Sequence, residues 1–185
     1  MDIPHHDTTT DFDPNNFFTS LFRTAKAILF SPKIFFEGMN REGGLRNPFI
    51  FLACCVLIHT LIAGLLLKNQ GLIARNLVFG MVLPFLTAAI LYFIITRLFK
   101  ASGTYEMAFR ANAYSAAVAL LSWMPLVGII LEFYRIYLIV LGLSSTFSIK
   151  VSQAFLAIAI TLLVYMALGT TIGRMTGGLW PGALP

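Results

Sequence analysis

Charged residues are the scarcest class of side chain in this sequence. Asp, Glu, Lys and Arg make up only 11% of its 185 residues, whereas 58% are hydrophobic and the mean hydropathy is +0.82. A soluble domain typically carries about 25% charged residues, because its surface must be solvated. The scarcity of charge therefore excludes an ordinary soluble domain and predicts an integral membrane protein.

Four segments contain no charged residue at all. They cover residues 47–67, 76–96 and 111–131, with 21 residues each, and residues 151–173, with 23. A helix of about 20 apolar residues crosses a hydrocarbon core of about 30 Å. Polar and apolar residues do not alternate in these segments as they do in barrel strands, so the predicted fold class is all-α.

Enzyme signatures and metal-binding cysteine pairs are also missing. Cys54 and Cys55 are adjacent, a spacing that matches no zinc or redox pair, and they are predicted to be packing residues. The sequence contains no metalloprotease, serine hydrolase, P-loop or dinucleotide motif. We therefore predict a non-enzymatic protein without a cofactor. The question of a metal stays open, because His5, His6 and Asp7 together could bind an ion.

The first 46 residues are predicted to form a cytoplasmic tail and an amphipathic helix. About 12 polar residues, expected to be disordered, precede Asp13-Pro14, a typical helix start. Apolar residues then recur at helical spacing, with basic residues between them, and a second short segment begins at Ser31-Pro32. This pattern favours a helix lying in the membrane interface. Its expected anchors are Phe18, Phe22, Leu29, Phe35 and Phe36; the alternative is a soluble helix packed on the bundle.

Residues 47–185 are predicted to form a transmembrane domain with five spans. The expected spans are residues 47–67, 76–96, 107–125, 128–148 and 151–173. Nine basic residues then lie on the side of the N-terminus and three on the other, which favours a cytoplasmic N-terminus and an external C-terminus in the cell membrane. The net charge of +5 is thus attributed to orientation rather than to nucleic-acid binding. In the alternative with four spans, the fourth segment lies flat and the C-terminus is inside.

Two charged residues fall within the fourth predicted span. Glu132 and Arg135 are three residues apart, and charges in a span cost about 2.5–3.5 kcal/mol each, so both require partners inside the protein. Two interpretations stay open: an ion pair that fixes helix register, or the lining of a cavity that binds a polar headgroup, a metal ion or a proton. His59, near the middle of the first span, is expected either to bond a neighbour or to form a relay with Glu132.

Two short motifs resemble one family of membrane proteins. The stretch FRTAKAILFSPKIFFEGM contains Ser31, Pro32 and Gly38, and the stretch SGTYEMAFRANAYS contains Phe109, Arg110 and Tyr114. Their order and spacing resemble the Yip (Ypt/Rab-interacting protein) domain family over roughly residues 20–170. The resemblance implies a small bacterial-type membrane protein with five spans, a cytoplasmic N-terminus and a capacity to form oligomers. The Asp-Leu-Tyr-Gly-Pro motif of eukaryotic members is absent, so it does not extend to their Rab-binding and vesicle-trafficking role.

Three functional hypotheses follow from these features. The first is a non-enzymatic membrane protein that organises lipid or recruits partners through its N-terminal helix, with the lipid bilayer, other proteins or further copies of the chain as partners. The second is a small transporter or channel whose polar cavity uses Glu132, Arg135 and His59. The third is an accessory subunit of a larger complex.

Overall fold

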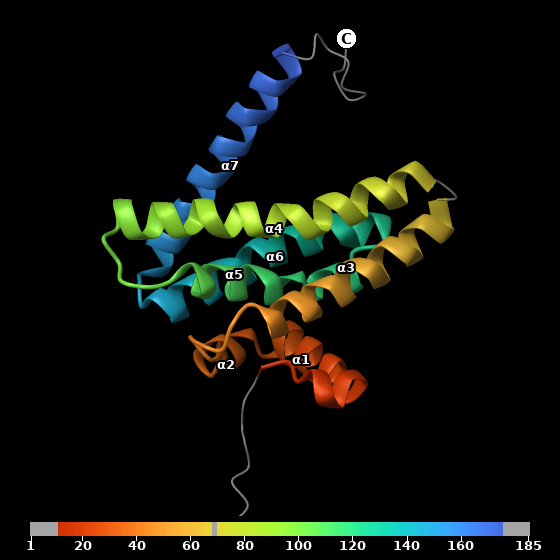
Figure 1. Cartoon of the computed structure of the whole chain (residues 1–185), viewed down its shortest axis with the longest axis horizontal. Coiled ribbons are helices and arrows are strands. Elements are labelled where there is room, and N and C mark those ends of the chain that lie inside the picture. Colours follow the sequence, from red (N-terminus) through yellow and green to blue (C-terminus); the bar gives the residue numbers. More distant parts are fainter. Residues whose placement is uncertain (1–10, 68–69, 176–185) are drawn as a thin grey trace, which may run out of the picture.

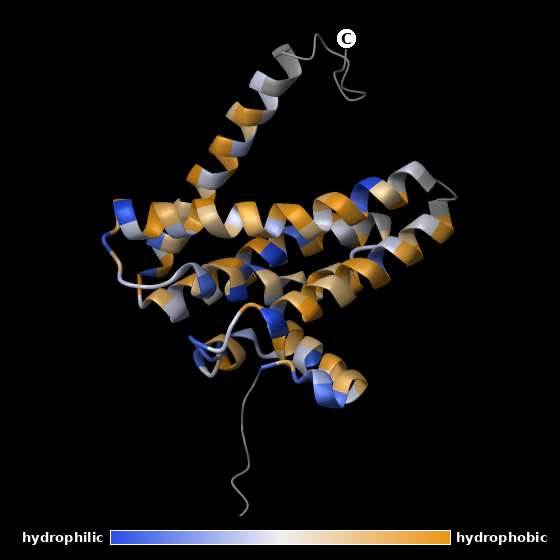
Figure 2. Ribbon diagram, in the orientation of Figure 1, coloured by the Kyte–Doolittle hydropathy of each residue, from blue (hydrophilic) through white to orange (hydrophobic). Residues whose placement is uncertain are grey.

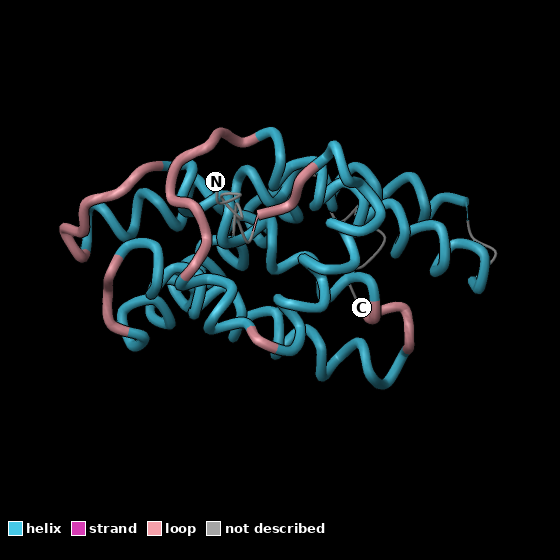
Figure 3. Tube along the Cα trace, turned by 90° about the horizontal axis from the view of Figure 1, so that it is seen from below, coloured by secondary structure: helices cyan, strands magenta, loops and turns pink. Residues whose placement is uncertain are grey.

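The computed structural model describes residues 11–67 and 70–175, and every regular element in these ranges is a helix (Figure 1). Seen from below, loops join the helices in short stretches (Figure 3). The all-α prediction is therefore confirmed. In chain order the elements are η1 (Pro14–Asn16), α1 (Phe17–Phe30), α2 (Pro32–Glu37), α3 (Arg46–Leu67), α4 (Gln70–Leu98), α5 (Tyr105–Tyr114), η2 (Ser115–Leu120), α6 (Pro125–Phe147) and α7 (Val151–Met175).

Four helices are long and apolar enough to cross a membrane: α3, α4, α6 and α7. Their most apolar stretches have mean hydropathies between 1.8 and 2.6, yet only 22–39% of the residues in them are buried within the protein. Hydrophobic residues colour most of α3, α4 and α7 (Figure 2). Exposed apolar surface on this scale is unfavourable in water and favourable against acyl chains. The protein is thus a multi-pass membrane protein.

The third expected span differs from the prediction. In place of one helix over residues 107–125, the chain forms the ten-residue α5, the six-residue 3-10 helix η2 and a turn. Every residue from Ala108 to Val118 is buried, and the segment packs against α3, α4 and α6. Its polar side chains require protein partners rather than lipid, and its alanines allow the neighbouring helices to approach closely. A bundle of five long helices is not confirmed: of the four long helices, α3, α4 and α6 enclose a shorter central segment.

The motif after Ser31 builds a close contact between α2 and the bundle. Pro32 is the first residue of α2, and Phe36 from this helix reaches Gly142 on α6. A Cβ atom at Gly142 would lie 2.8 Å from the Cβ of Ala111 and 3.0 Å from the ring of Phe36. Glycine is therefore required where α2, α5 and α6 meet.

Helix α7 is packed on the bundle over its N-terminal part only. It packs on α4 and α6 as far as Tyr165, and its C-terminal turns extend away from the other helices (Figure 1). Residues 166–171 are exposed, and a Cβ atom at Gly169 would meet no other atom within 4 Å. Gly169 therefore makes no close contact with another helix in the described part of the chain.

The two glycines supply a matched test of this packing. Gly142→Ala is expected to destabilise the protein by about 1–3 kcal/mol, because the added methyl group overpacks the junction of α2, α5 and α6. Gly169→Ala adds the same methyl group to an open helix surface and is expected to change stability little. Thermal unfolding of both variants in detergent measures the difference, and a larger loss in Gly169→Ala would contradict this account of the packing.

Candidate functional site

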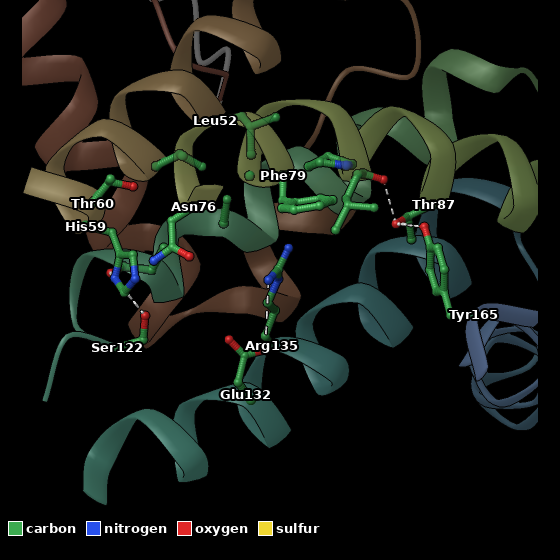
Figure 4. Close-up of a pocket in the computed structure, with 16 residues that line it drawn as sticks. Leu52, His59, Thr60, Asn76, Phe79, Thr87, Ser122, Glu132, Arg135 and Tyr165 are labelled. Atoms are coloured by element: carbon green, nitrogen blue, oxygen red, sulfur yellow. Dashed lines mark hydrogen bonds and ion pairs between the residues drawn. The ribbon is translucent and has the colours of Figure 1, made fainter. Parts of the chain in front are cut away.

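A polar cavity of about 430 Å³ lies between α3, α4 and α6, with η2 and α7 at its edges (Figure 4). Each of the four long helices contributes at least one polar side chain to its lining. These residues are His59 and Thr60 from α3, Asn76 and Thr87 from α4, Ser122 after η2, Glu132 and Arg135 from α6, and Tyr165 from α7. Polar groups are costly within a bilayer, so their convergence from separate helices marks this cavity as the candidate site.

The sequence singled out three of these residues, and the structure brings all three to one cavity. Glu132 and Arg135 come from α6, and His59 comes from α3. Sequence reasoning missed Thr60, Asn76, Ser122, Thr87 and Tyr165, because uncharged polar residues are common in apolar helices and carry no spacing signal. Only the packing of the helices shows that they face the same space.

The expected ion pair is present but loose. Arg135 Nη1 lies 3.9 Å from Glu132 Oε2, which is beyond hydrogen-bond distance. The side chains are 33% and 60% exposed, respectively, and the buried Nε of Arg135 has no hydrogen-bond partner. Within the described part of the chain, neither side chain makes a hydrogen bond. Because both residues belong to α6, their pair joins no two helices and so cannot fix the register between them.

His59 is held by the segment that follows α5. Its Nδ1 lies 3.0 Å from the carbonyl oxygen of Ala119 and 3.2 Å from Oγ of Ser122. A carbonyl only accepts, so Nδ1 of His59 carries a proton and donates it to the Ala119 carbonyl. The prediction of a histidine bonded to a neighbour is thus confirmed, and no hydrogen bond or ion pair links it to Glu132 among the described residues.

A smaller polar space continues from this cavity toward α7. It has a volume of about 210 Å³ and shares Thr87, Glu132, Arg135 and Tyr165 with the first. Its lining adds Asn112, whose side-chain amide donates to the Pro84 carbonyl over 3.0 Å. Thr87 and Tyr165 are joined by a hydrogen bond of 2.8 Å, which ties α4 to α7 (Figure 4).

The described residues contain no group of three or more His, Cys, Asp or Glu that could hold a metal ion. The suggested ligands His5, His6 and Asp7 lie outside the described residues. Cys54 and Cys55 are free thiols in α3, half-buried and buried, as expected for packing residues.

A second charged cluster, around Arg110, connects the N-terminus to the bundle. Arg110 is buried, pairs with Asp11 and with Glu106 at 3.5 Å, and donates to the Gly44 carbonyl over 3.1 Å. The Tyr114 hydroxyl accepts a hydrogen bond from the Phe12 amide at 3.3 Å. Disorder was expected as far as about residue 12, but Asp11 and Phe12 are buried. The correction has a physical cause: a charge at position 110 inside the bundle needs a carboxylate.

The other motif residues are structural. Ser31 ends α1 and precedes α2, Gly38 caps α2, and Phe109 stacks on Phe85 with ring centroids 4.5 Å apart. Phe35 packs edge-on against Tyr114 at 5.2 Å. Phe35 and Phe36 were expected to anchor at lipid headgroups, but both are buried inside the protein. They anchor α2 to the bundle and not to the membrane.

The helix start expected at Asp13-Pro14 is the start of the 3-10 helix η1, whereas α1 itself begins at Phe17 without a side-chain cap. Asp13 caps η1 and accepts a hydrogen bond of 3.0 Å from the Asn15 amide, which holds the pKa of Asp13 below its ordinary value. The inner face of α1 is buried against the bundle through Ser20, Thr24, Ala25 and Ile28. Basic and apolar residues therefore share the outer face, in contrast to the expected division into one apolar and one basic face.

The outer face of α1 and α2 carries four large apolar side chains. Phe18, Phe22, Phe30 and Ile34 are 71–82% exposed, and Arg23, Lys26 and Lys33 lie exposed beside them. Of the expected anchors, Phe18 and Phe22 belong to this surface. Leu29 is only half-buried, and its carbonyl accepts a hydrogen bond of 2.8 Å from the Tyr134 hydroxyl. We call Phe18, Phe22, Phe30 and Ile34 the outer apolar stripe.

Comparisons with known proteins give one finding. The family model of the Yip1 domain matches residues 26–172, which include α2 to η2, α6, the end of α1 from residue 26 and most of α7. Comparisons with curated proteins and with solved structures give no match.

Removing the carboxylate that neutralises Arg110 tests the second cluster. Asp11→Asn is expected to cost about 3 kcal/mol of stability, because it removes one partner of a buried ion pair. Glu37→Gln is the control, since Glu37 pairs with Lys33 at 4.0 Å on the surface and such pairs contribute about 0–1 kcal/mol. The midpoints of thermal unfolding of the two variants are compared in detergent. Equal effects of the two substitutions would contradict the role given to Asp11.

Proposed function

The chain belongs to the Yip1 domain family, and we propose that it is a non-enzymatic membrane protein that organises the lipid around its N-terminal helices. The observation that carries this proposal is the outer apolar stripe on α1 and α2. Burying one such side chain is worth about 1.5–3 kcal/mol, so a surface with four of them is favoured in a membrane interface over water.

The basic residues of the same face suit the headgroup region. Lys26 lies between Phe22 and Phe30 at helical spacing, and Arg23 is adjacent. Long basic side chains can extend to lipid phosphates while their stems and the neighbouring rings lie deeper. Attraction to anionic lipids adds about 1 kcal/mol for each basic residue near the surface. An aromatic stripe with interspersed cations therefore favours an anionic membrane surface.

A fixed attachment makes α1 suitable for acting on the bilayer. Its inner face is packed on the bundle, and the hydrogen bond from Tyr134 to the Leu29 carbonyl connects its last turn to α6. At the N-terminal end of α1, the Asp13 amide donates a hydrogen bond of 2.7 Å to Oγ of Ser20 and so connects the preceding segment to the helix. A helix held in this way inserts at a constant place beside the spans and displaces lipid there. Protein partners that dock on the same stripe are the alternative.

The proposed orientation places the N-terminus in the cytoplasm and the C-terminus outside. The central segment of α5 and η2 would be about 27 Å long from its residue count, close to the hydrocarbon thickness of about 30 Å. It can therefore act as a fifth crossing that its neighbours shield from lipid. Without Arg110, which is buried, eight basic residues remain on the N-terminal side against three on the other, and this supports the orientation.

The rival hypothesis, a small transporter or channel, draws its support from the polar cavity alone. The cavity shows a place where a polar group can be held, and this is the subject of the further inference below.

Replacing the phenylalanines of the outer stripe tests the main proposal. Full-length protein with Phe18→Ser, Phe22→Ser and Phe30→Ser is expected to lose most of its deformation of anionic vesicles, measured as the fraction tubulated in electron micrographs. The matched control carries leucine at the same positions, which keeps the apolar surface, and is expected to act like the unsubstituted protein. Both variants should remain in the membrane after alkaline extraction. Equal tubulation by the serine and leucine variants would refute the proposal.

The orientation has its own test. A reporter fused after Pro185 is expected to be active only outside the cytoplasm, because five crossings separate the two termini. The same reporter fused before Met1 serves as the opposite control. A cytoplasmic reporter at the C-terminus would leave an even number of crossings and overturn this topology.

A further inference from the structure

We infer that the polar cavity binds a zwitterionic headgroup in which a phosphate lies at Arg135 and a primary ammonium lies at Glu132. The inference concerns the interior of the bundle and does not rest on the proposed role of α1. The ligand of this chemistry has two sources, a membrane lipid and a soluble phosphoester.

The guanidinium of Arg135 is the first support. It has five N–H donors, and within the described residues none of them is used in a hydrogen bond. The side chain extends from α6 toward Leu52 and Phe79, across the cavity (Figure 4). The Nε donor is buried, and leaving a buried donor of a charged group unpaired is costly. A phosphate accepts two parallel hydrogen bonds from a guanidinium and would satisfy them.

The carboxylate of Glu132 beside Arg135 favours a ligand that carries one negative and one positive group. Its carboxylate lies 3.9 Å from Arg135 and accepts no hydrogen bond from the described residues. An anion alone would be repelled by Glu132, and a cation alone would be repelled by Arg135. A ligand with both charges satisfies both side chains. Because Glu132 offers hydrogen-bond acceptors, a primary ammonium with N–H donors suits it better than a quaternary one.

A buried hydroxyl supplies the second, independent observation. Thr60 lines the cavity and is only 2% exposed, yet its Oγ1 has no hydrogen-bond partner. Most hydroxyls at such depth have a partner, so an orphaned one in a polar cavity indicates a missing group. Asn76 and Ser122 offer further polar atoms around the same space. Neutral donors of this kind suit phosphate and glycerol oxygens.

The apolar surroundings favour a lipid as the source. A groove of about 700 Å³ runs between α6 and α7, and its lining is almost wholly apolar. It shares Ile136, Ile158 and Leu162 with the smaller polar space beside Glu132 and Arg135. The apolar groove and the smaller polar space therefore lie next to each other and share these side chains, which suits a ligand with a polar headgroup and an apolar chain.

Binding of three lipids to the full-length protein in detergent tests the inference. Phosphatidylethanolamine, phosphatidylcholine and phosphatidylglycerol with identical acyl chains are compared by native mass spectrometry. Phosphatidylethanolamine is expected to bind about tenfold or more tightly than either of the others, because only it has both a phosphate and N–H donors on a cation. Equal binding of the three lipids would overturn the inference.

Substitutions locate the binding. Arg135→Gln and Glu132→Gln are each expected to weaken phosphatidylethanolamine binding by about tenfold to a hundredfold, and Glu132→Gln also removes the preference over phosphatidylglycerol. The controls Arg97→Gln and Glu37→Gln remove the same charges from exposed positions and are expected to bind as the unsubstituted protein does. Unchanged binding and preference in both cavity variants would overturn the assignment.

Thr60→Val keeps the test decisive if a charge variant does not fold. Valine has nearly the same shape as threonine and lacks only the unpartnered hydroxyl, so the stability of the lipid-free protein is expected to stay equal or rise. Phosphatidylethanolamine binding is expected to fall severalfold. Binding equal to that of the unsubstituted protein would contradict the part given to Thr60 and overturn the site.

Competition with free glycerophosphoethanolamine separates the two sources. If it displaces the lipid, the site recognises the headgroup chemistry by itself and can take a soluble phosphoester. If the lipid is selected but not displaced at millimolar concentrations of competitor, the acyl chains contribute and the source is the membrane. Failure of both the lipid and the free headgroup to bind would overturn the inference.

Discussion

A guanidinium buried in the middle of a membrane bundle must find its partners within the protein, and the arrangement around Arg110 follows from this constraint. Two carboxylates and one backbone carbonyl surround it, and they come from the N-terminal segment, from the loop before α3 and from α5 itself. Each partner fixes the position of a different part of the chain. The N-terminal layer of α1 and α2 is thereby joined to the central helix.

Buried Arg110 and partly exposed Arg135 differ in how many partners their guanidinium groups have. Arg110 has two carboxylate partners and a carbonyl, while Arg135 has one carboxylate on its own helix at 3.9 Å. A surrounding of the first kind belongs to the fold, because removing one of the partners would leave a buried charge uncompensated. A surrounding of the second kind leaves donors available in a cavity, which is the condition for binding a polar ligand. The family motif includes Arg110, whereas Arg135 lies outside the two motifs.

The places where sequence reasoning failed share one physical cause. Phe35 and Phe36 have the composition of an interfacial anchor, and residues 111–131 are free of charge over the length of a span. Hydropathy measures the preference for leaving water, and it does not distinguish lipid from the interior of a protein. Inside the bundle Phe35 packs against Tyr114 and Phe36 lies against Gly142, and three long helices enclose α5. Neither arrangement could be inferred from local pattern.

The sequence by itself determined the class of the protein. Charge-free segments of membrane-spanning length form helices, and a charged side chain within a span needs partners inside the protein. It also singled out Glu132, Arg135 and His59, since ionisable groups are conspicuous among apolar ones. The tertiary structure alone decided that these three share a cavity, that Thr60 lies there without a partner, and that Asp11 neutralises Arg110. The reason is that hydropathy and helical period act over one or two turns, whereas a cavity and a buried ion pair depend on which distant faces of the helices meet.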